Sequence, residues 1–374
     1  MATLVFPKTI VEYPLPGAVQ THELVSVNGS LIVVSQQSDS KLVKMARDPQ
    51  TGLINAAASF TIGSEKDGLH GLRASEVFPG MVWATLQFTS KLLLINPNSG
   101  SVNAAPEIVR TIDVPFPGRG PHVVIEEGEY LWVTLKDSAH VLHINFNNPS
   151  EYTLYKAARK PIFVARHPTN NRVYVSQDQS SKILEIDTAL GFQREIDVPE
   201  EEGATPVGLI AGPDGNVWFT LAGPQGGAQG TFVKIDADGE FNYFHLTTDQ
   251  GSTAGLLHLA FEVNQTNLPR LHLVASTIAD SASFDGVITV TLDADYSAID
   301  TQTTYTFPTQ LSKLHRVLVL GDQLFVTELS TSAVAQIFLP VPAATPIDED
   351  DDYYSLFGQG AADTQVEYAN PTIR

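Results

Sequence analysis

"TPVGLIAGPDGNVWFT", residues 205–220, carries the pattern that decides the fold. It consists of a loop, a short apolar strand, a Gly-Pro-Asp-Gly turn and a second strand rich in aromatic and β-branched residues, which is typical of a β-hairpin. Comparable stretches begin at Thr21, Leu69, Pro121, Pro161, Leu257 and Leu314. Each second strand ends in Thr or Ser. The chain therefore contains seven copies of one hairpin.

A third apolar strand follows each hairpin, as in KLLLIN at 91–96 and KILEID at 182–187. Most copies continue into a fourth strand that is shorter and more polar, such as REIDVPE at 194–200. A four-stranded unit that repeats every ~40–57 residues is typical of a β-propeller blade. We therefore predict an all-β fold, a seven-bladed β-propeller with four-stranded antiparallel blades.

The two ends of the repeat complement each other. The seventh copy stops after its third strand at Pro340, whereas residues 9–17, TIVEYPLPG, resemble a fourth strand with no blade before it. Pairing the two closes the ring and removes the open strand edges that an unclosed array would expose. We predict a single propeller domain over residues 1–340, closed by the N-terminal strand, and an acidic C-terminal tail over residues 341–374.

The net charge of −20 argues against polyanionic partners. Nucleic acids and anionic membranes are held by Lys and Arg, so we expect neither and predict a small-molecule ligand. The chain has no cysteine, which leaves the compartment open, and sequons at Asn28 and Asn264 would permit a secretory route. Secretion and a cytoplasmic location are about equally compatible with the sequence, and the oligomeric state stays open.

Five of the ten histidines share one position at the beginning of a first strand, where the other two copies have Ile162 and Val207. The first strand of a propeller blade lines the central channel, so this position forms a ring at one mouth. Imidazole exchanges protons near neutral pH. We predict that the catalytic residues are these five and Glu328, namely His22, His70, His122, His258, His315 and Glu328.

The loop between the second and third strands opens on the same face as this ring. It brings amides, one amine and one carboxylate beside the imidazoles, over aromatic walls, which is the usual pattern of a small-molecule pocket. The predicted substrate-binding residues are Gln36, Gln87, Phe88, Lys136, Phe163 and Gln177. The alternative is that the histidines serve the fold, each bonding a backbone carbonyl of the neighbouring blade.

The segments GPDGNVWFTLAG (212–223) and TFVKIDADGEFNYFHL (231–246), with TPVG ahead of them, resemble the streptogramin B (virginiamycin B) lyase family. The resemblance implies a seven-bladed propeller that opens a cyclic depsipeptide by elimination, with a channel-mouth His as base and Mg²⁺ held by a carboxylate near a second His. His258 and His315 match that register, but Lys313 replaces the carboxylate. We expect no cofactor, with Mg²⁺ as the alternative if the family's elimination is retained.

In its size, degenerate repeats and histidine content the chain also resembles the fungal hetero-Diels-Alderases of tropolone-sesquiterpenoid biosynthesis. That resemblance implies dehydration of a hydroxymethyl polyketide to a quinone methide, which a humulene-type alkene then captures. We therefore predict a natural-product lyase or cyclase acting on an apolar small molecule at the His-lined mouth. The alternatives are streptogramin-lyase-like elimination, metal-dependent hydrolysis or oxygenation at the clustered His, and a non-catalytic scaffold that binds a protein through its rim.

Overall fold

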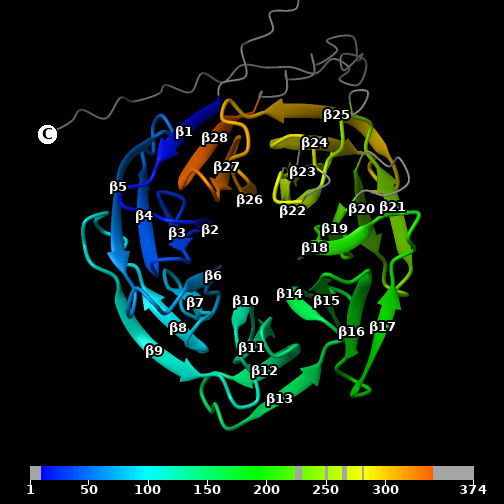
Figure 1. Ribbon diagram of the computed structural model, residues 1–374, viewed down its shortest axis with the longest axis horizontal. Coiled ribbons are helices and arrows are strands. Elements are labelled where there is room, and N and C mark those ends of the chain that lie inside the picture. Colours follow the sequence, from blue (N-terminus) through cyan, green and yellow to red (C-terminus); the bar gives the residue numbers. More distant parts are fainter. Residues whose placement is uncertain (1–9, 224–229, 249–251, 263–267, 280–281, 340–374) are drawn as a thin grey trace, which may run out of the picture. The chain divides into compact units, whose positions relative to one another are not determined.

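The computed structural model describes residues 10–223, 230–248, 252–262, 268–279 and 282–339. Its strands, β1 to β28, form seven four-stranded antiparallel sheets around a central axis (Figure 1). This confirms the predicted all-β, seven-bladed propeller. Within these ranges, no helix has the length and apolar character needed to cross a membrane.

We number the blades 1 to 7 in chain order, starting from the blade that contains β2. The innermost strands are β2 (Thr21–Ser26), β6 (Leu69–Ala74), β10 (Pro121–Glu127), β14 (Lys160–Arg166), β18 (Ala204–Ala211), β22 (Leu256–Glu262) and β26 (Leu314–Leu320). The second strands are β3 (Leu31–Gln36), β7 (Val82–Leu86), β11 (Tyr130–Leu135), β15 (Arg172–Asp178), β19 (Val217–Gly223), β23 (Arg270–Ala275) and β27 (Gln323–Glu328).

The remaining strands lie toward the outside of each blade. The third strands are β4 (Lys41–Arg47), β8 (Lys91–Asn96), β12 (His140–Asn145), β16 (Lys182–Asp187), β20 (Thr231–Ile235), β24 (Gly286–Leu292) and β28 (Ala333–Phe338). The outermost strands are β5 (Ile54–Thr61), β9 (Glu107–Asp113), β13 (Tyr152–Lys156), β17 (Phe192–Asp197), β21 (Phe241–His245), β25 (Ile299–Thr306) and, for blade 7, β1 (Ile10–Pro14).

Strand β1 closes the ring. It pairs antiparallel with β28, from Ile10 opposite Ile337 to Pro14 opposite Ala333, and Figure 1 shows the blue first strand beside the orange last one. The Tyr13 hydroxyl adds a hydrogen bond of 2.9 Å to Gln336 Oε1. The predicted closure by an N-terminal strand is confirmed. The predicted tail, residues 341–374, lies outside the described residues, as do residues 1–9.

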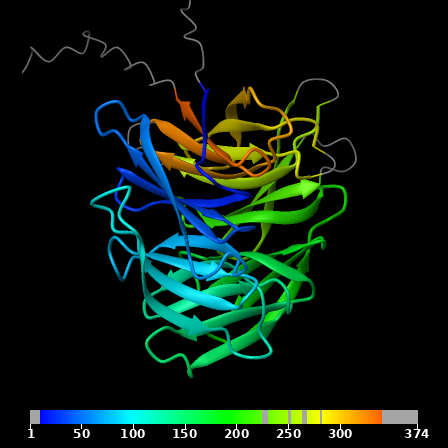
Figure 2. The same cartoon turned by 60° about the vertical axis from the view of Figure 1, so that its left-hand side comes forward.

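The blades pack face to face, and the view in Figure 2 shows neighbouring sheets stacked around the ring. Second and third strands are covered on both faces, which is why they are nearly continuous apolar runs, whereas outer strands such as β17 are polar. The packing between two blades is illustrated by Trp83 of blade 2, which is fully buried against Val133 and Leu142 of blade 3. Each blade thus buries its faces only against its neighbours.

The innermost strands carry a β-bulge near their start that joins one blade to the next. In blade 1 the register breaks between Thr21 and Leu24, so that two residues lie opposite Ser35. The Ser35 hydroxyl accepts the N–H of Glu23 at 3.1 Å and donates to the carbonyl of His70 in blade 2 at 2.5 Å. A hydroxyl that accepts and donates in this way explains the Ser or Thr at this position in blades 1, 2, 3, 4 and 7, whereas blade 6 has Val274 there.

The same arrangement recurs around the ring. Hydroxyl-to-carbonyl bonds between blades run from Thr85 to His122, Thr134 to Ile162, Ser176 to Val207 and Thr327 to His22, at 3.1, 3.0, 2.6 and 2.8 Å. Bulges re-aim side chains at the edges of sheets. Here the bulge holds two consecutive residues of the innermost strand in six blades and Leu257 alone in blade 6, and this segment of each strand builds the site.

Candidate functional site

The residues at the bulge of each innermost strand form two tiers in the channel. The upper tier, nearer the mouth, lines a cavity of about 620 Å³. It comprises His22, His70, His122, Ile162, Val207, Leu257 and His315. The lower tier follows one residue later and comprises Glu23, Gly71, Val123, Phe163, Gly208, His258 and Arg316.

The prediction that His258 belongs to the histidine ring is wrong by one residue. In blade 6 the bulge falls on Leu257, because Leu256 pairs with Ala275 and His258 pairs with Val274. Leu257 therefore lines the cavity, and His258 lies in the lower tier, where its Nδ1 accepts the N–H of Val317 at 3.4 Å. A shift of one residue in a strand changes the direction of the side chain.

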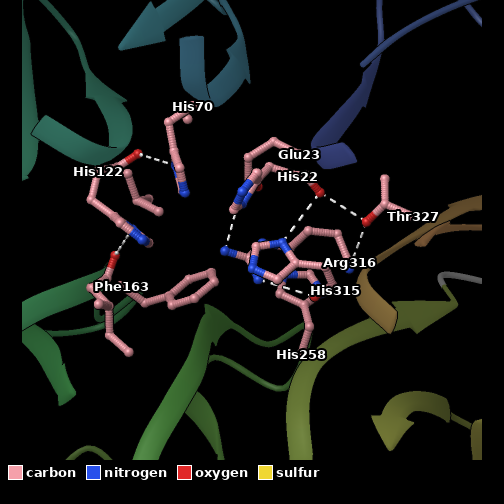
Figure 3. Close-up of polar contacts among 12 residues, drawn as sticks. His22, Glu23, His70, His122, Phe163, His258, His315, Arg316 and Thr327 are labelled. Carbon is pink, nitrogen blue, oxygen red and sulfur yellow. Dashed lines mark hydrogen bonds and ion pairs between the residues drawn. The ribbon is translucent and has the colours of Figure 1, made fainter. Parts of the chain in front are cut away.

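The other four histidines come together as predicted, and we call them the His arc: His22, His70, His122 and His315. Ring centroids are 4.5 Å apart for His22 and His70, 4.0 Å for His70 and His122, and 4.6 Å for His22 and His315. Blades 7, 1, 2 and 3 are consecutive in the closed ring, so the arc is continuous (Figure 3). Blades 4, 5 and 6 complete the upper tier with the aliphatic arc of Ile162, Val207 and Leu257.

Hydrogen bonds fix the protonated nitrogen in three of the arc's imidazoles. Nδ1 of His70 lies 3.2 Å from the carbonyl of His122, Nδ1 of His122 lies 3.1 Å from that of Ile162, and Nδ1 of His315 lies 3.3 Å from that of His22. A carbonyl oxygen only accepts, so each Nδ1 carries the proton and each neutral ring keeps a bare Nε2. The fourth, His22, has a buried Nδ1 without a hydrogen-bond partner among the described residues.

Burial keeps the arc neutral. Together with the positive charges of Arg316 and Lys136, it lowers the pKa of His22 from 6.5 to about 3. Burial likewise holds the pKa values of His70, His122 and His315 well below 6.5, with neighbouring imidazoles and Arg316 or Lys136 adding to the effect. All four imidazoles are therefore neutral, with a single ring N–H, at pH 7.

Arg316 forms the floor of the cavity. Its side chain is 3% exposed, and its guanidinium lies over the ring of Phe163 at 4.2 Å. Nη2 is 2.5 Å from Oε1 of Glu23, and Nη1 donates to the carbonyl of His315 at 3.0 Å. Blades 7, 1 and 4 thus meet across the channel one residue below the His arc (Figure 3).

The floor charges oppose each other's shifts. Burial raises the pKa of Glu23 and lowers that of Arg316, while the attraction between the two charges acts against both shifts. Two lower-tier glycines let the backbone of the next blade approach closely. A Cβ on Gly71 would lie 2.2 Å from the carbonyl oxygen of His122, and one on Gly208 would lie 2.8 Å from Cα of His258.

The mouth is lined by residues that lie two positions after the recurring Ser or Thr of the second strand. Gln37 Nε2 donates to Gln87 Oε1 at 2.6 Å, and Lys136 Nζ lies 3.6 Å from Asp178 Oδ2. All four side chains border the cavity. The predicted positions of Gln87 and Lys136 at the pocket are therefore found in the structure, and Phe163 lines it as well.

Three predicted mouth residues do not border the cavity. Gln36, Gln177 and Glu328 come directly after the Ser or Thr, and the period of two in a strand turns them into the blade, where they are at most 1% exposed. Gln36 accepts the hydroxyl of Thr21, Gln177 donates to Glu195, and Glu328 accepts the hydroxyl of Thr331.

Glu328 and Phe88 also differ from the predicted site. Burial raises the pKa of Glu328 to about 7, but this carboxyl group is not among the groups that line the cavity, so its predicted catalytic role lacks contact with the site. Phe88 is 56% exposed and likewise does not line it, because its ring folds over Gly68 outside the mouth.

Sequence reasoning missed the residues that act across blades. Gln37 and Asp178 each lie one residue beyond a predicted position, so strict two-residue alternation would have found them. Arg316 directly follows the predicted His315. A cationic residue beside an imidazole in an otherwise apolar strand was the signal in the sequence that could have identified it. Its partner Glu23 is adjacent only after the ring closes.

The donor set does not fit Mg²⁺. Hard cations prefer several oxygen ligands. Asp178, which lines the cavity, is paired with Lys136, and Glu23 in the lower tier is paired with Arg316. Among the described residues, no group of three or more His, Asp or Glu side chains is arranged as metal ligands. Lys313 does not line the cavity.

No protein-family model and no curated protein matches the chain. Solved structures do. A catalytically inactive histidine-to-alanine variant of virginiamycin B lyase from Staphylococcus aureus, with quinupristin, superposes with a TM-score of 0.68 at 15% identity over 89% of this chain and 99% of that one. A streptogramin B lyase structure gives 0.66 at 17% identity over 89% and 98%.

The propeller fold is also shared with proteins of other kinds. YCF48 bound to D1 peptide matches with a TM-score of 0.62 at 12% identity, over 92% of this chain and 99% of that one. At such identities, the likeness establishes the seven-bladed propeller and leaves the chemistry to be argued from the site.

Proposed function

We propose that the protein is a lyase or cyclase that acts on an amphipathic small molecule in this cavity, with an imidazole of the His arc as the proton acceptor. The observation that carries the proposal is the set of Nδ1 bonds that leaves Nε2 unprotonated in His70, His122 and His315. Three bare acceptors beside a cavity of about 620 Å³ are suited to receive protons from a bound ligand.

The need to join blades does not account for the imidazoles. The joint between blades 4 and 5 is made by the Ser176 hydroxyl and the Val207 carbonyl, with Ile162 in the imidazole position. The joint between blades 1 and 2 likewise uses the Ser35 hydroxyl, while Nδ1 of His22 has no partner among the described residues. Because the same joints form without an imidazole bond, the His arc supports a role in binding and chemistry.

The chemistry that follows is an acid-base elimination. A neutral imidazole takes a proton from an acidic C–H or O–H of the ligand, the released electron pair forms a new double bond, and the leaving group departs from the next atom with its bonding pair. Burial disfavours the imidazolium, so it returns the proton readily to the leaving group. Proton transfer of this kind contributes about a hundred- to ten-thousandfold to the rate.

The fold comparison supports the lyase class but not a particular substrate. In the structure with quinupristin, replacing one histidine by alanine inactivates virginiamycin B lyase. The present site retains histidines at the channel mouth but its carboxylates do not fit Mg²⁺. We therefore propose metal-independent proton transfer, which separates this site from the family's metal-assisted elimination and from hydrolysis or oxygenation at clustered His.

Dehydration followed by a hetero-Diels-Alder reaction is the second candidate, and the aliphatic arc favours it. The His arc would remove a phenolic proton while hydroxide leaves as water, giving a quinone methide. Ile162, Val207 and Leu257 would hold a terpenoid alkene against it, so that one C–C and one C–O bond form together. Holding two reactants in this way supplies several kcal/mol through effective molarity.

Turnover of two probes tests the proposal: quinupristin, and a hydroxymethyl tropolone mixed with humulene, each followed by mass spectrometry. We expect conversion of one probe, a hundredfold or greater loss of kcat/KM in His122→Leu, and a change within about threefold in the control Leu257→Met. Equal turnover in wild type and His122→Leu would overturn the proposal. So would failure to convert either probe when titration shows that both bind; this is the result expected of a non-catalytic scaffold.

A further inference from the structure

Arg316 places a guanidinium at the floor of the cavity, and three contacts with other residues hold it there. Phe163 covers one face at 4.2 Å, and Glu23 and the His315 carbonyl hold the two terminal nitrogens. A guanidinium has five N–H donors in a rigid fork, and these contacts use two of them. The side chain still lines the cavity, so a donor edge remains for a ligand.

We infer that Arg316 makes the cavity floor an oxyanion-binding subsite, so that the ligand is an apolar molecule that enters with a carboxylate or equivalent oxyanion first. The inference rests on the proposed function only because both concern the same cavity. It concerns recognition, and it would hold for a ligand that is bound and not converted.

The pairing with Glu23 leaves Arg316 able to take a second anion. The two side chains make a single contact, between one carboxylate oxygen and Nη2, whereas two parallel bonds would engage both partners fully. Nε of Arg316 has no hydrogen-bond partner among the described residues. A ligand oxyanion therefore meets a cation that is only partly satisfied by the protein.

A structural role alone does not account for a charge here. Buried ion pairs stabilise proteins little, and well-packed apolar residues often serve as well. The same lower-tier position is occupied by Val123 in blade 3 and by Phe163 in blade 4. A propeller of this kind can therefore close its channel with apolar side chains, and blade 7 instead places a cation beneath four neutral imidazoles.

The surrounding groups complement an oxyanion carried on an apolar body. The aliphatic arc offers Ile162, Val207 and Leu257 to the body. The imidazoles above Arg316 are neutral, so no fixed negative charge besides Glu23 lies in the two tiers of the described chain. Arg316 thus provides orientation for the ligand, and the His arc above it provides the proton acceptor.

Binding of 2-naphthoate and its neutral isostere 2-naphthamide, measured by calorimetric titration, tests the subsite. We expect wild-type protein to bind the carboxylate at least tenfold more tightly than the amide. Glu23→Gln removes the competing carboxylate and should increase that preference several-fold. The double variant Glu23→Gln/Arg316→Met should lose the preference while still binding 2-naphthamide, which shows that the cavity is intact.

Equal affinity of the two probes for wild-type protein would overturn the inference, as would an unchanged preference in the double variant or no saturable binding of 2-naphthoate. Should the double variant fail to fold, Glu23→Gln decides alone, because a weaker preference in it contradicts the inference. His122→Leu distinguishes this result from the proposed function. It should abolish turnover and leave the naphthoate preference within about threefold of wild type.

Discussion

The His arc and the aliphatic arc occupy the same backbone position in different blades and differ only in their side chains. Both arise from a bulge, and both present carbonyls that accept a Ser or Thr hydroxyl from the preceding blade, as at His122 and Ile162. Yet blades 7, 1, 2 and 3 provide imidazoles, whereas blades 4, 5 and 6 provide Ile162, Val207 and Leu257.

This difference shows which part of the repeat belongs to the fold and which to the site. The bulge and the hydroxyl recur irrespective of the upper-tier side chain, so they maintain the ring. The imidazoles occur only along one continuous side, and the polar mouth residues Gln37, Gln87, Lys136 and Asp178 continue that side over blades 1 to 4. The cavity thus has a polar wall and an apolar wall.

The largest expected effect comes from converting part of the polar wall to the apolar one. In the double variant His70→Leu/His122→Leu we expect kcat/KM to fall by a thousandfold or more, because two neutral proton acceptors are removed. The thermal midpoint at pH 7.5 should stay within a few degrees of wild type. A double variant that unfolds at pH 7.5 would instead assign the imidazoles to the fold.

Acid stability should separate the two walls next. Since folded pKa values in the His arc lie below 6.5, the unfolded chain binds more protons than the native one once the pH falls below 6.5, and stability decreases. Each such imidazole contributes roughly 1.4 kcal/mol per pH unit until its folded pKa is reached. Urea unfolding at pH 7 and pH 5 should show a smaller loss for His70→Leu/His122→Leu than for wild type; an equal loss would contradict the lowered pKa values.

Two single variants compare the interblade contact beneath the aliphatic arc with one beside the His arc. Ser176→Ala leaves the Val207 carbonyl without its interblade donor, whereas after Thr134→Val the Ile162 carbonyl still has Nδ1 of His122. A buried group left unsatisfied costs about 1–3 kcal/mol. We expect urea titrations to show the larger loss for Ser176→Ala. A larger loss for Thr134→Val would mean that the imidazole bond contributes nothing to the joint.

The smallest expected effect is at Glu328, a carboxyl group outside both walls. Its folded pKa of about 7 exceeds the unfolded value, so the native state binds the extra proton and stability falls as the pH rises from 4.5 through 7. Glu328→Gln should therefore stabilise the protein at pH 8 by up to about 1 kcal/mol and leave kcat/KM unchanged. Loss of turnover in this variant would restore the predicted catalytic role of Glu328.

The repeat was legible in the sequence because each blade buries the same strands against its neighbours and so repeats the same apolar pattern. Ring closure and four of the five ring histidines followed from that alignment. The error at His258 has a local cause: Leu256 and Leu257 are both apolar, so nothing in the sequence marks which of them begins the bulge.

The floor of the cavity was not predictable by the same means. Arg316 meets Glu23 and Phe163 from two other blades, and these contacts exist only in the closed ring. The predictions at Gln36 and Gln177 were wrong by one position. The residue directly after each Ser or Thr points into the blade, and the residue after that borders the cavity. Local periodicity gives the elements, whereas the site depends on contacts between distant segments.

The state of the imidazoles tests the account most directly, and long-range ¹H–¹⁵N NMR of labelled histidine measures it without a substrate. The account predicts that His70, His122 and His315 are neutral at pH 7, with the proton on Nδ1 and a bare Nε2, and that they remain neutral at pH 6. Imidazolium signals at pH 6, or protons on Nε2 in these three rings, would contradict it.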